Sequence, residues 1–335
     1  MNLTTRYLGL ELPHPFMAGA GPMADTLDGA RRVEDAGACA LVLRSLFEEQ
    51  IDREAMATHY SVEAHAESFG EATSYFPDPV DFVMGPDEYL ETLRRTKGAL
   101  GIPVFASLNG YTAGGWLSHA RLLEQAGADA LELNLYYVAT DEHESSRDIE
   151  ERSVEMVRRV RAAVGIPIAV KLSPFYTSLP HVAHRLEEAA ADGLVLFNRF
   201  FETDIDVETL ELRPSLRLST SDELLLRLRW LAVLSGRLRR ATLAVSGGVH
   251  TVPDAIKAIM AGASAVQVVS ALLREGPGLL ARLRSGLSAW MEERGYESVA
   301  QMRGSMDIIH CPDPEALTRA NYMRVLQTWK PEPQG

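Results

Sequence analysis

Polar residues stand inside or at the ends of several short apolar segments of this 335-residue sequence. In ALELNLYY (130–137) a buried-strand pattern is followed by the amide Asn134 and by two phenols. In PIAVKLS (167–173) the amine of Lys171 lies within an apolar run. Amides and amines are costly in a buried strand unless something there uses their hydrogen bonds. These positions therefore indicate a ligand site.

Most of the candidate strands end in polar or small residues of this kind. A single one is often only a core group with a satisfied hydrogen bond. Six strands that end this way favour a shared site, because the carboxyl ends of parallel strands gather on one side. The residues concerned are Ala20, Gly21, Arg44, Ser45, Asn109, Asn134, Lys171, Asn198, Arg199, Ser246, Gly247, Gly248 and Ser270.

The last two candidate strands carry a phosphate-binding pattern. Ser246, Gly247 and Gly248 follow the seventh strand, and Ser270 follows the eighth. Glycines leave main-chain N–H groups open, and the N-terminus of the next helix favours an anion. A phosphate between the last two strands is a recurring arrangement in barrels. The spacing therefore predicts a ligand that bears a phosphate.

Lys171 adds a positive charge to this predicted site. A cation inside a barrel stabilises negative charge on the carbonyl edge of a reduced flavin. FMN needs a phosphate pocket, amides for its pyrimidine ring and such a cation, and the sequence offers all three. We therefore expect FMN as the cofactor, and no metal. The alternatives are an internal ion pair for Lys171 and a phosphate-binding barrel that does not use flavin.

The strands that carry these residues alternate with amphipathic helical segments. Eight such units predict an α/β fold, a (β/α)8 TIM barrel, with a doubly wound sheet as the alternative. Three helical segments end in Ala-Gly-Ala before a strand, with the glycines at Gly37, Gly127 and Gly262. The candidate strands are 15–21, 39–45, 103–109, 130–137, 167–173, 193–200, 241–248 and 265–272.

We expect a single FMN-binding barrel domain over 1–335, with a long insertion at 46–86 and a C-terminal extension at 296–335. A formal net charge of −13 argues against nucleic acid and against anionic membranes as partners. With two cysteines, Cys39 and Cys311, neither a disulfide framework nor an in-chain iron–sulfur cluster is expected. A cytoplasmic location fits best.

The sequence resembles the dihydroorotate dehydrogenase family, in particular its soluble class 1 enzymes. The resemblance implies an (α/β)8 barrel with FMN over the carboxyl ends of the strands, a homo-oligomer such as a dimer, and a place in pyrimidine biosynthesis. The matching blocks are HPFMAGAGPM, AGACALVLRS, PVFASLNG, AGADALELN, PIAVKLSP and SGGVHTVPDAIKAIMAGASAVQVVSALLREGP.

The resemblance also implies which residues contact FMN. Arg44, Asn198 and Ser246, which end strands of the same expected barrel, complete the cofactor-binding set. The contacts implied by the resemblance are Ala20, Gly21, Ser45, Asn109, Asn134, Lys171, Gly247, Gly248 and Ser270.

The substrate side departs from the family pattern. After its fourth strand the family shows Asn-hydrophobic-Ser-Cys-Pro-Asn, in which the cysteine, or a serine in its place, is the catalytic base. Here Tyr137 stands at the base position and Ala139 at the position of the final amide. A phenol has an ordinary pKa near 10, so Tyr137 is a base only if nearby cations lower that value. As a general acid or a stacking wall it needs no shift.

Arg44 and Arg199 are predicted to place two guanidinium groups near the flavin, an arrangement suited to a carboxylate. Together with Tyr136 they are the expected substrate contacts, and Tyr137 and Lys171 are the expected catalytic residues. We expect an FMN-dependent oxidoreductase that acts on CH–CH bonds of a small, carboxylated, dihydroorotate-like substrate. A second acceptor, a protein or a small molecule, would then receive the electrons. The alternative is an FMN-binding electron-relay or accessory protein that has lost dihydroorotate chemistry.

Overall fold

Eight parallel strands close into a barrel in the computed structural model, which describes residues 1–48, 50, 85–110, 114–135, 137–199, 203–214, 216–318 and 326–328. The last strand pairs with the first, so the predicted (β/α)8 barrel is confirmed and a doubly wound sheet is excluded. The barrel strands are β3 (Phe16–Ala18), β4 (Leu41–Phe47), β5 (Val104–Gly110), β6 (Ala130–Leu135), β7 (Ile168–Leu172), β8 (Gly193–Leu196), β11 (Thr242–Ser246) and β12 (Ala265–Val268).

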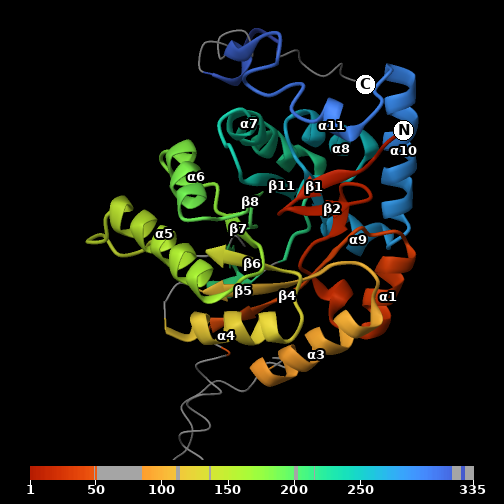
Figure 1. Cartoon of the computed structure of the whole chain (residues 1–335). Helices are drawn as coiled ribbons and strands as arrows, with labels where there is room; N and C mark the ends of the chain where they lie inside the picture. The colour runs from red at the N-terminus through yellow and green to blue at the C-terminus, as the bar shows by residue number, and fades with distance from the viewer. Residues whose placement is uncertain are drawn as a thin grey trace, which may run out of the picture.

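Helices surround this barrel (Figure 1). They follow the strands in turn, and their buried faces pack against the outer side of the barrel. The α-helices are α1 (Leu27–Asp35), α3 (Pro86–Ala99), α4 (Gly114–Gln125), α5 (Ser146–Ala163), α6 (Leu179–Glu188), α7 (Leu224–Ser235), α8 (Val252–Met260), α9 (Ser270–Glu275), α10 (Leu279–Arg294) and α11 (Val299–Met302). The described residues also form the short 3-10 helices η1 (Pro22–Ala24), η2 (Ser221–Glu223) and η3 (Pro314–Leu317).

The three predicted glycine caps are confirmed. Gly37, Gly127 and Gly262 have φ values of 92°, 98° and 121°, which L side chains rarely adopt. Each glycine follows a helix and turns the chain into the next strand. This local signal therefore predicted the ends of three helices.

A short N-terminal hairpin, which the sequence pattern did not predict, closes the amino end of the barrel. It consists of β1 (Thr5–Tyr7) and β2 (Leu10–Leu12). Tyr7 and Leu8 pack against the inward side chains Phe105 and Val195 and form with them a buried apolar cluster. The floor of the barrel is therefore closed to solvent.

The barrel interior changes from apolar to polar along the strands. On β6, Ala130 belongs to the apolar floor, while Glu132 and Asn134 follow at the same side-chain period of two. On β7, Ala169 is likewise followed by Lys171. The pleat alone thus brings the polar groups of neighbouring strands together at the carboxyl end.

The two predicted additions to the barrel are described only in part. Strand β4 runs on to Phe47 and helix α3 begins at Pro86, while 51–84 of the expected 46–86 insertion lie outside the described residues. The extension packs on α7 and α8, where Ile308 N–H donates to Ala232 O at 2.9 Å and Gly304 N–H donates to Ile259 O at 3.1 Å.

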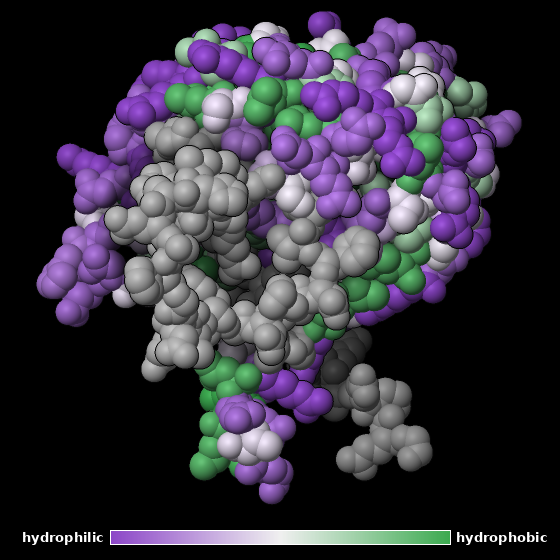
Figure 2. All heavy atoms as spheres, turned by 90° about the horizontal axis from the view of Figure 1, so that it is seen from below, coloured by the Kyte–Doolittle hydropathy of each residue, from purple (hydrophilic) through white to green (hydrophobic). Residues whose placement is uncertain are grey.

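A second hairpin, also unpredicted, lies between β8 and α7. It pairs β9 (Thr203–Asp206) with β10 (Glu211–Pro214), and Ile205 stands opposite Leu212 with both side chains exposed. Elsewhere, hydrophilic side chains cover most of the described surface that is visible from below (Figure 2). Among the described residues, none of the helices combines the length and the apolar character needed to cross a membrane.

Candidate active site

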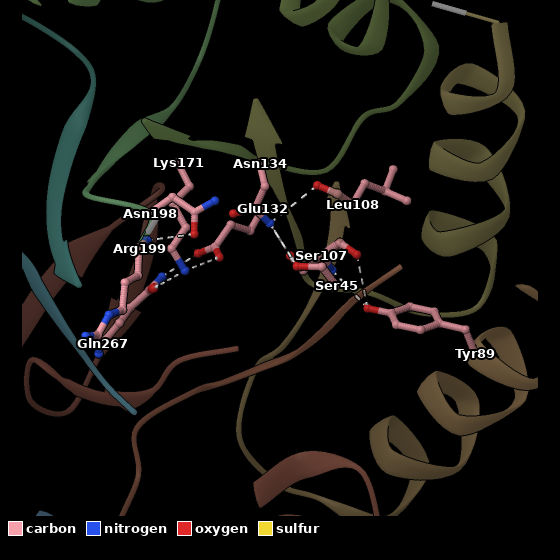
Figure 3. Close-up of polar contacts among 10 residues, drawn as sticks. All are labelled: Ser45, Tyr89, Ser107, Leu108, Glu132, Asn134, Lys171, Asn198, Arg199 and Gln267. Atoms are coloured by element: carbon pink, nitrogen blue, oxygen red, sulfur yellow. Dashed lines mark hydrogen bonds and ion pairs between the residues drawn. The ribbon is translucent and has the colours of Figure 1, made fainter. Parts of the chain in front are cut away.

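Three polar side chains from adjacent strands form a hydrogen-bonded triangle at the carboxyl end of the barrel (Figure 3). The amide nitrogen of Asn134 donates to Ser45 Oγ at 3.0 Å and to Ser107 Oγ at 2.8 Å. The two hydroxyls are themselves 2.8 Å apart. The phenol of Tyr89, from α3, meets the backbone N–H of Ser107 at 3.0 Å. Asn134 is thereby held in one orientation, with its amide directed across β5 and β4.

Lys171 lies in a buried ion pair beside this triangle. Its Nζ is 3.1 Å from Glu132 Oε1, and its side chain is 7% exposed while that of Glu132 is fully buried. Gln267 Nε2 donates to the other carboxylate oxygen, and Gln267 Oε1 accepts from Lys171 at 3.5 Å. The internal ion pair considered for Lys171 is thus present. Its ammonium nonetheless lies in the polar layer at the mouth of the barrel, where the flavin was predicted.

Glu132 and Gln267 were not among the predicted site residues. A signal was present, since Glu132 is a charged residue in the middle of the apolar run ALELNL. Its partners, however, lie 39 and 135 residues away, and only barrel closure brings them together.

Both glycines of the predicted phosphate loop lie in the left-handed backbone region. Gly247 and Gly248 have φ values of 80° and 81°. Gly248 N–H donates to the hydroxyl of Ser219 at 3.4 Å, and that hydroxyl lies 3.1 Å from His250 Nε2. Ser219 N–H in turn donates to Ser270 Oγ at 3.1 Å. Ser219 and His250 were missed, because neither follows a barrel strand directly.

The first strand approaches the last through small residues. A Cβ added at Gly19 would lie 2.8 Å from Val269 Cγ2, and one at Gly21 would lie 2.9 Å from Val269 Cγ1. Ala20, between them, packs against the apolar cluster of the floor. Side chains larger than these would fill the space between the ends of β3 and β12.

The two predicted substrate arginines differ in their surroundings. Arg44 is half exposed and binds Asp25 of the loop after η1, so it lies at the rim. Arg199 is more buried, and its Nη2 is 3.6 Å from Glu223 Oε1. Its Nη1 is buried and has no hydrogen-bond partner among the residues that the structure describes. Arg199 therefore keeps a donor for an acidic group.

Asn109 and Asn198 both end strands at the mouth and are half-buried. Asn109 stands opposite Asn134 in the β5–β6 register. Asn198 Oδ1 accepts from Arg199 N–H at 3.0 Å. Ser246 is buried, and its carbonyl accepts a hydrogen bond from Arg227 Nε. The predicted Tyr136 lies outside the described residues.

Tyr137 contacts Glu144 of the β6–α5 connection and Arg152 of α5. Its hydroxyl donates to Glu144 Oε2 at 2.6 Å, and Arg152 lies 4.5 Å from the centre of its ring. The hydrogen bond to Glu144 raises the pKa of Tyr137 above its usual value near 10, and Arg152 only partly opposes this. The phenol thus keeps its proton at neutral pH, which disfavours its use as a base.

A pocket of about 330 Å³ lies next to Tyr137, between the β6–α5 and β7–α6 connections. Its wall is largely apolar and includes Val138, Phe175 and Tyr176, with the hydroxyls of Ser173 and Thr177 among them. Ser173 lies two residues beyond Lys171, which places this pocket beside the mouth of the barrel.

A model of the family described as dihydroorotate dehydrogenase matches residues 83–291 of the chain. The chain belongs to the dihydroorotate dehydrogenase family. The matched span includes β5, β6, β7, β8, β11 and β12, which carry Ser107 and Asn134 of the triangle, the Lys171 pair and the glycine loop.

Curated relatives align over 90% of the chain. The chain is 27% identical to the catalytic subunit of dihydroorotate dehydrogenase B (NAD(+)) from Thermoplasma volcanium, over 90% of this chain and 98% of that protein. It is 28% identical to the corresponding subunit from Methanothermobacter thermautotrophicus, over 90% and 97%. It is 24% identical to the NAD-dependent dihydropyrimidine dehydrogenase subunit PreA of Escherichia coli, over 90% and 76%.

Proposed function

We propose that this chain is an FMN-dependent oxidoreductase that acts on a CH–CH bond of a small, carboxylated substrate resembling dihydroorotate. The observation that carries the proposal is the polar layer at the mouth of a barrel whose floor is closed, with Asn134 and Lys171 in register on neighbouring strands. The names of the aligned relatives support the reaction class, since all three are dehydrogenases.

The residues at the mouth fit FMN. Lys171 and Asn134 offer a cation and an amide. Gly247 and Gly248 form a left-handed backbone segment that carries no side chains of its own. Ala20, Gly21, Ser45, Asn109, Asn198, Ser246 and Ser270 complete the proposed set, with Arg44 at its rim. FMN, when bound, supplies a two-electron acceptor for a hydride. The chain supplies the positive charge that favours the reduced form.

Arg199 is the proposed anchor for the substrate carboxylate. Its Nη1 is a buried donor with no partner among the described residues, and such a group gains most when an anion arrives. Arg44, already bound to Asp25 at the rim, would contribute less. Tyr137 is proposed as a wall or proton donor, because its pKa is raised.

The test is an anaerobic mixture of the FMN-reconstituted protein with dihydroorotate, followed through the visible flavin band. We expect FMN to bind and the band to bleach. Lys171→Gln should weaken FMN binding and slow bleaching. Lys97→Gln is the matched control, because Lys97 is also paired with a carboxylate, that of Asp129, but lies outside the barrel.

Each result has a definite meaning. Bleaching in the wild-type protein and in Lys97→Gln, with loss in Lys171→Gln, supports the proposal. A wild-type protein that takes up no FMN contradicts it. A protein that binds FMN but stays oxidised with dihydroorotate retains the cofactor part of the proposal and rejects this substrate.

The surroundings of Tyr137 favour one second candidate, an FMN-binding electron-relay or accessory protein. The family's base position holds a phenol that keeps its proton, and Ala139 offers no side-chain amide to a substrate. Rapid flavin reduction by a partner protein, without turnover of any dihydropyrimidine, would favour this alternative.

We also propose a cytoplasmic homo-oligomer, such as a dimer, that passes electrons to a second protein or a small acceptor. Two of the aligned relatives are named as catalytic subunits, which implies other subunits in those proteins. The chain has only two cysteines, so an iron–sulfur cluster in the electron path would belong to a partner. A role in pyrimidine biosynthesis follows if dihydroorotate is the substrate.

A further inference from the structure

Glu132 is a fully buried carboxylate whose partners both come from other strands. It accepts from Lys171 at 3.1 Å and from Gln267 at 2.5 Å, so each of its oxygens has one donor (Figure 3). A buried carboxylate without partners would be strongly disfavoured, but Glu132 has both an ion-pair partner and a hydrogen-bond donor. The three side chains form one unit across β6, β7 and β12.

Stability alone is a weak explanation for this unit. A buried ion pair replaced by well-packed apolar residues is often as stable or more stable, because desolvation offsets the attraction between the charges. The apolar floor just beneath it shows that this barrel can be filled with alanine, valine and phenylalanine. The charged unit begins only where the polar mouth begins.

The unit fixes the position of the Lys171 ammonium. A lysine has a flexible four-carbon stem, and Glu132 and Gln267 hold its end inside the barrel at 7% exposure. Among the described residues, the other titratable groups that interact electrostatically with Glu132 are the phenols of Tyr7 and Tyr89. Both are buried and neutral, since burial raises the pKa of each. These groups of the described part of the chain thus contribute one cation and one anion.

We propose that Glu132 is a positioning residue that holds the ammonium of Lys171 at the barrel mouth and, through its own charge, lowers the reduction potential of FMN bound there. This inference rests on the proposed function. Lys171 alone would favour the reduced, more negative flavin, and the Glu132 carboxylate opposes it. Gln267 assists by keeping the carboxylate turned toward Lys171.

The test compares the two-electron midpoint potential of the FMN-loaded wild-type protein with that of Glu132→Gln by anaerobic dye equilibration at pH 6. Loss of the anion should favour reduction at least tenfold, which is about 30 mV toward positive potential. Glu132→Asp keeps the negative charge but moves it away from Lys171, because the side chain is shorter. Its midpoint potential should lie between those of the wild-type protein and Glu132→Gln.

Glu187→Gln is the matched control. Glu187 is also buried, but it accepts from the backbone N–H groups of Arg239, Arg240 and Ala241 at the amino end of β11. Its loss should reduce stability without a change in potential. A merely structural role for Glu132 would produce the same pattern in Glu132→Gln.

The outcomes separate the two proposals. If the wild-type protein does not bind FMN, the proposed function fails. If it binds FMN and Glu132→Gln has the wild-type potential, or a more negative one, only the inference about Glu132 is overturned. Should Glu132→Gln not fold, Glu132→Asp carries the test, and an unchanged potential in that variant overturns the inference.

Discussion

At the scale of single residues, the local partner decides what a side chain can do. Tyr137 occupies the position of a catalytic base in the family pattern, yet its proton is held by Glu144 at 2.6 Å. Of the barrel cations that could have lowered its pKa, Lys171 is bound to Glu132 and Arg44 to Asp25. The cation beside Tyr137 is Arg152, which the next helix supplies.

The raised pKa of Tyr137 gives a first prediction. Glu144→Gln removes the anion that disfavours the tyrosinate, so the pKa of Tyr137 should fall while Arg152 continues to favour ionisation. An ultraviolet titration of tyrosinate, with Tyr137→Phe subtracted to isolate this one phenol, measures the change. A pKa of Tyr137 that is higher in Glu144→Gln than in the wild-type protein would contradict the assigned cause.

At the scale of elements, the N-terminal hairpin buries one side chain, Tyr7, whose polar group destabilises the fold. The Tyr7 hydroxyl is buried in the floor of the barrel, and it has no hydrogen-bond partner among the described residues. Tyr89 is also buried, but its hydroxyl meets Ser107 N–H at 3.0 Å. An unsatisfied buried hydroxyl is destabilising, whereas a satisfied one contributes to stability.

We therefore expect opposite effects from the same substitution at these two positions. Tyr7→Phe should raise the free energy of unfolding by about 1 kcal/mol, and Tyr89→Phe should lower it by about 1–3 kcal/mol. Urea unfolding followed by circular dichroism measures both. The assignment fails if Tyr7→Phe is the less stable of the two variants.

The glycine loop after β11 depends on a close approach as well as on a positive φ. A Cβ at Gly248 would lie 2.6 Å from the backbone nitrogen of Leu224, at the start of α7. Gly295, at the end of α10, has a similar φ of 74° but nothing within 4 Å of the added atom. A comparison of alanine substitutions at Gly248 and Gly295 therefore distinguishes backbone strain from steric overlap.

Gly295→Ala should lower the free energy of unfolding by about 1–2 kcal/mol through its left-handed backbone alone. Gly248→Ala should cost about 1–3 kcal/mol more, because α7 must move away from the loop. It should also weaken FMN binding, whereas Gly295→Ala should not. Thermal or urea unfolding together with a flavin-binding titration tests both statements. Equal losses of stability would show that the contact with Leu224 is unimportant.

At the scale of the whole molecule, buried carboxylates link stability to pH. Glu187 is buried, which alone would raise its pKa, but three backbone N–H groups and Arg240 more than offset this and lower the pKa below its usual 4.5. A carboxyl group with a depressed folded pKa stabilises the fold above its unfolded pKa. That contribution is lost as the pH falls through the folded value.

Glu187→Gln should accordingly be less stable than the wild-type protein at pH 7 by about 1.5–3 kcal/mol, the range for hydrogen bonds to a charged group. The difference should shrink as the pH falls below 4.5, the usual value for this group. Unfolding free energies across this range measure it. Glu155→Gln, an exposed carboxylate on α5, is the control and should change little. A difference independent of pH would contradict the linkage.

The sequence by itself determined the barrel and the side of it on which the polar residues lie. Strand patterns, glycine caps and strand-end residues are local signals, and β6 shows this well. Its apolar run predicted a buried strand, and the alternation of Glu132 and Asn134 places both side chains inside. The eight strands and the glycines at Gly37, Gly127 and Gly262 could be read in the same way.

Only the tertiary structure decided which groups meet. Glu132 and Gln267 are 135 residues apart, and Ser219 is 29 residues from the Gly248 N–H that it caps. The hairpin at the floor packs Tyr7 against Phe105, which lies 98 residues further along the chain. Such contacts depend on barrel closure, which places strands at angles that no short segment specifies. The charge beside Lys171 and the proton on Tyr137 are consequences of that closure and of the helix that follows β6.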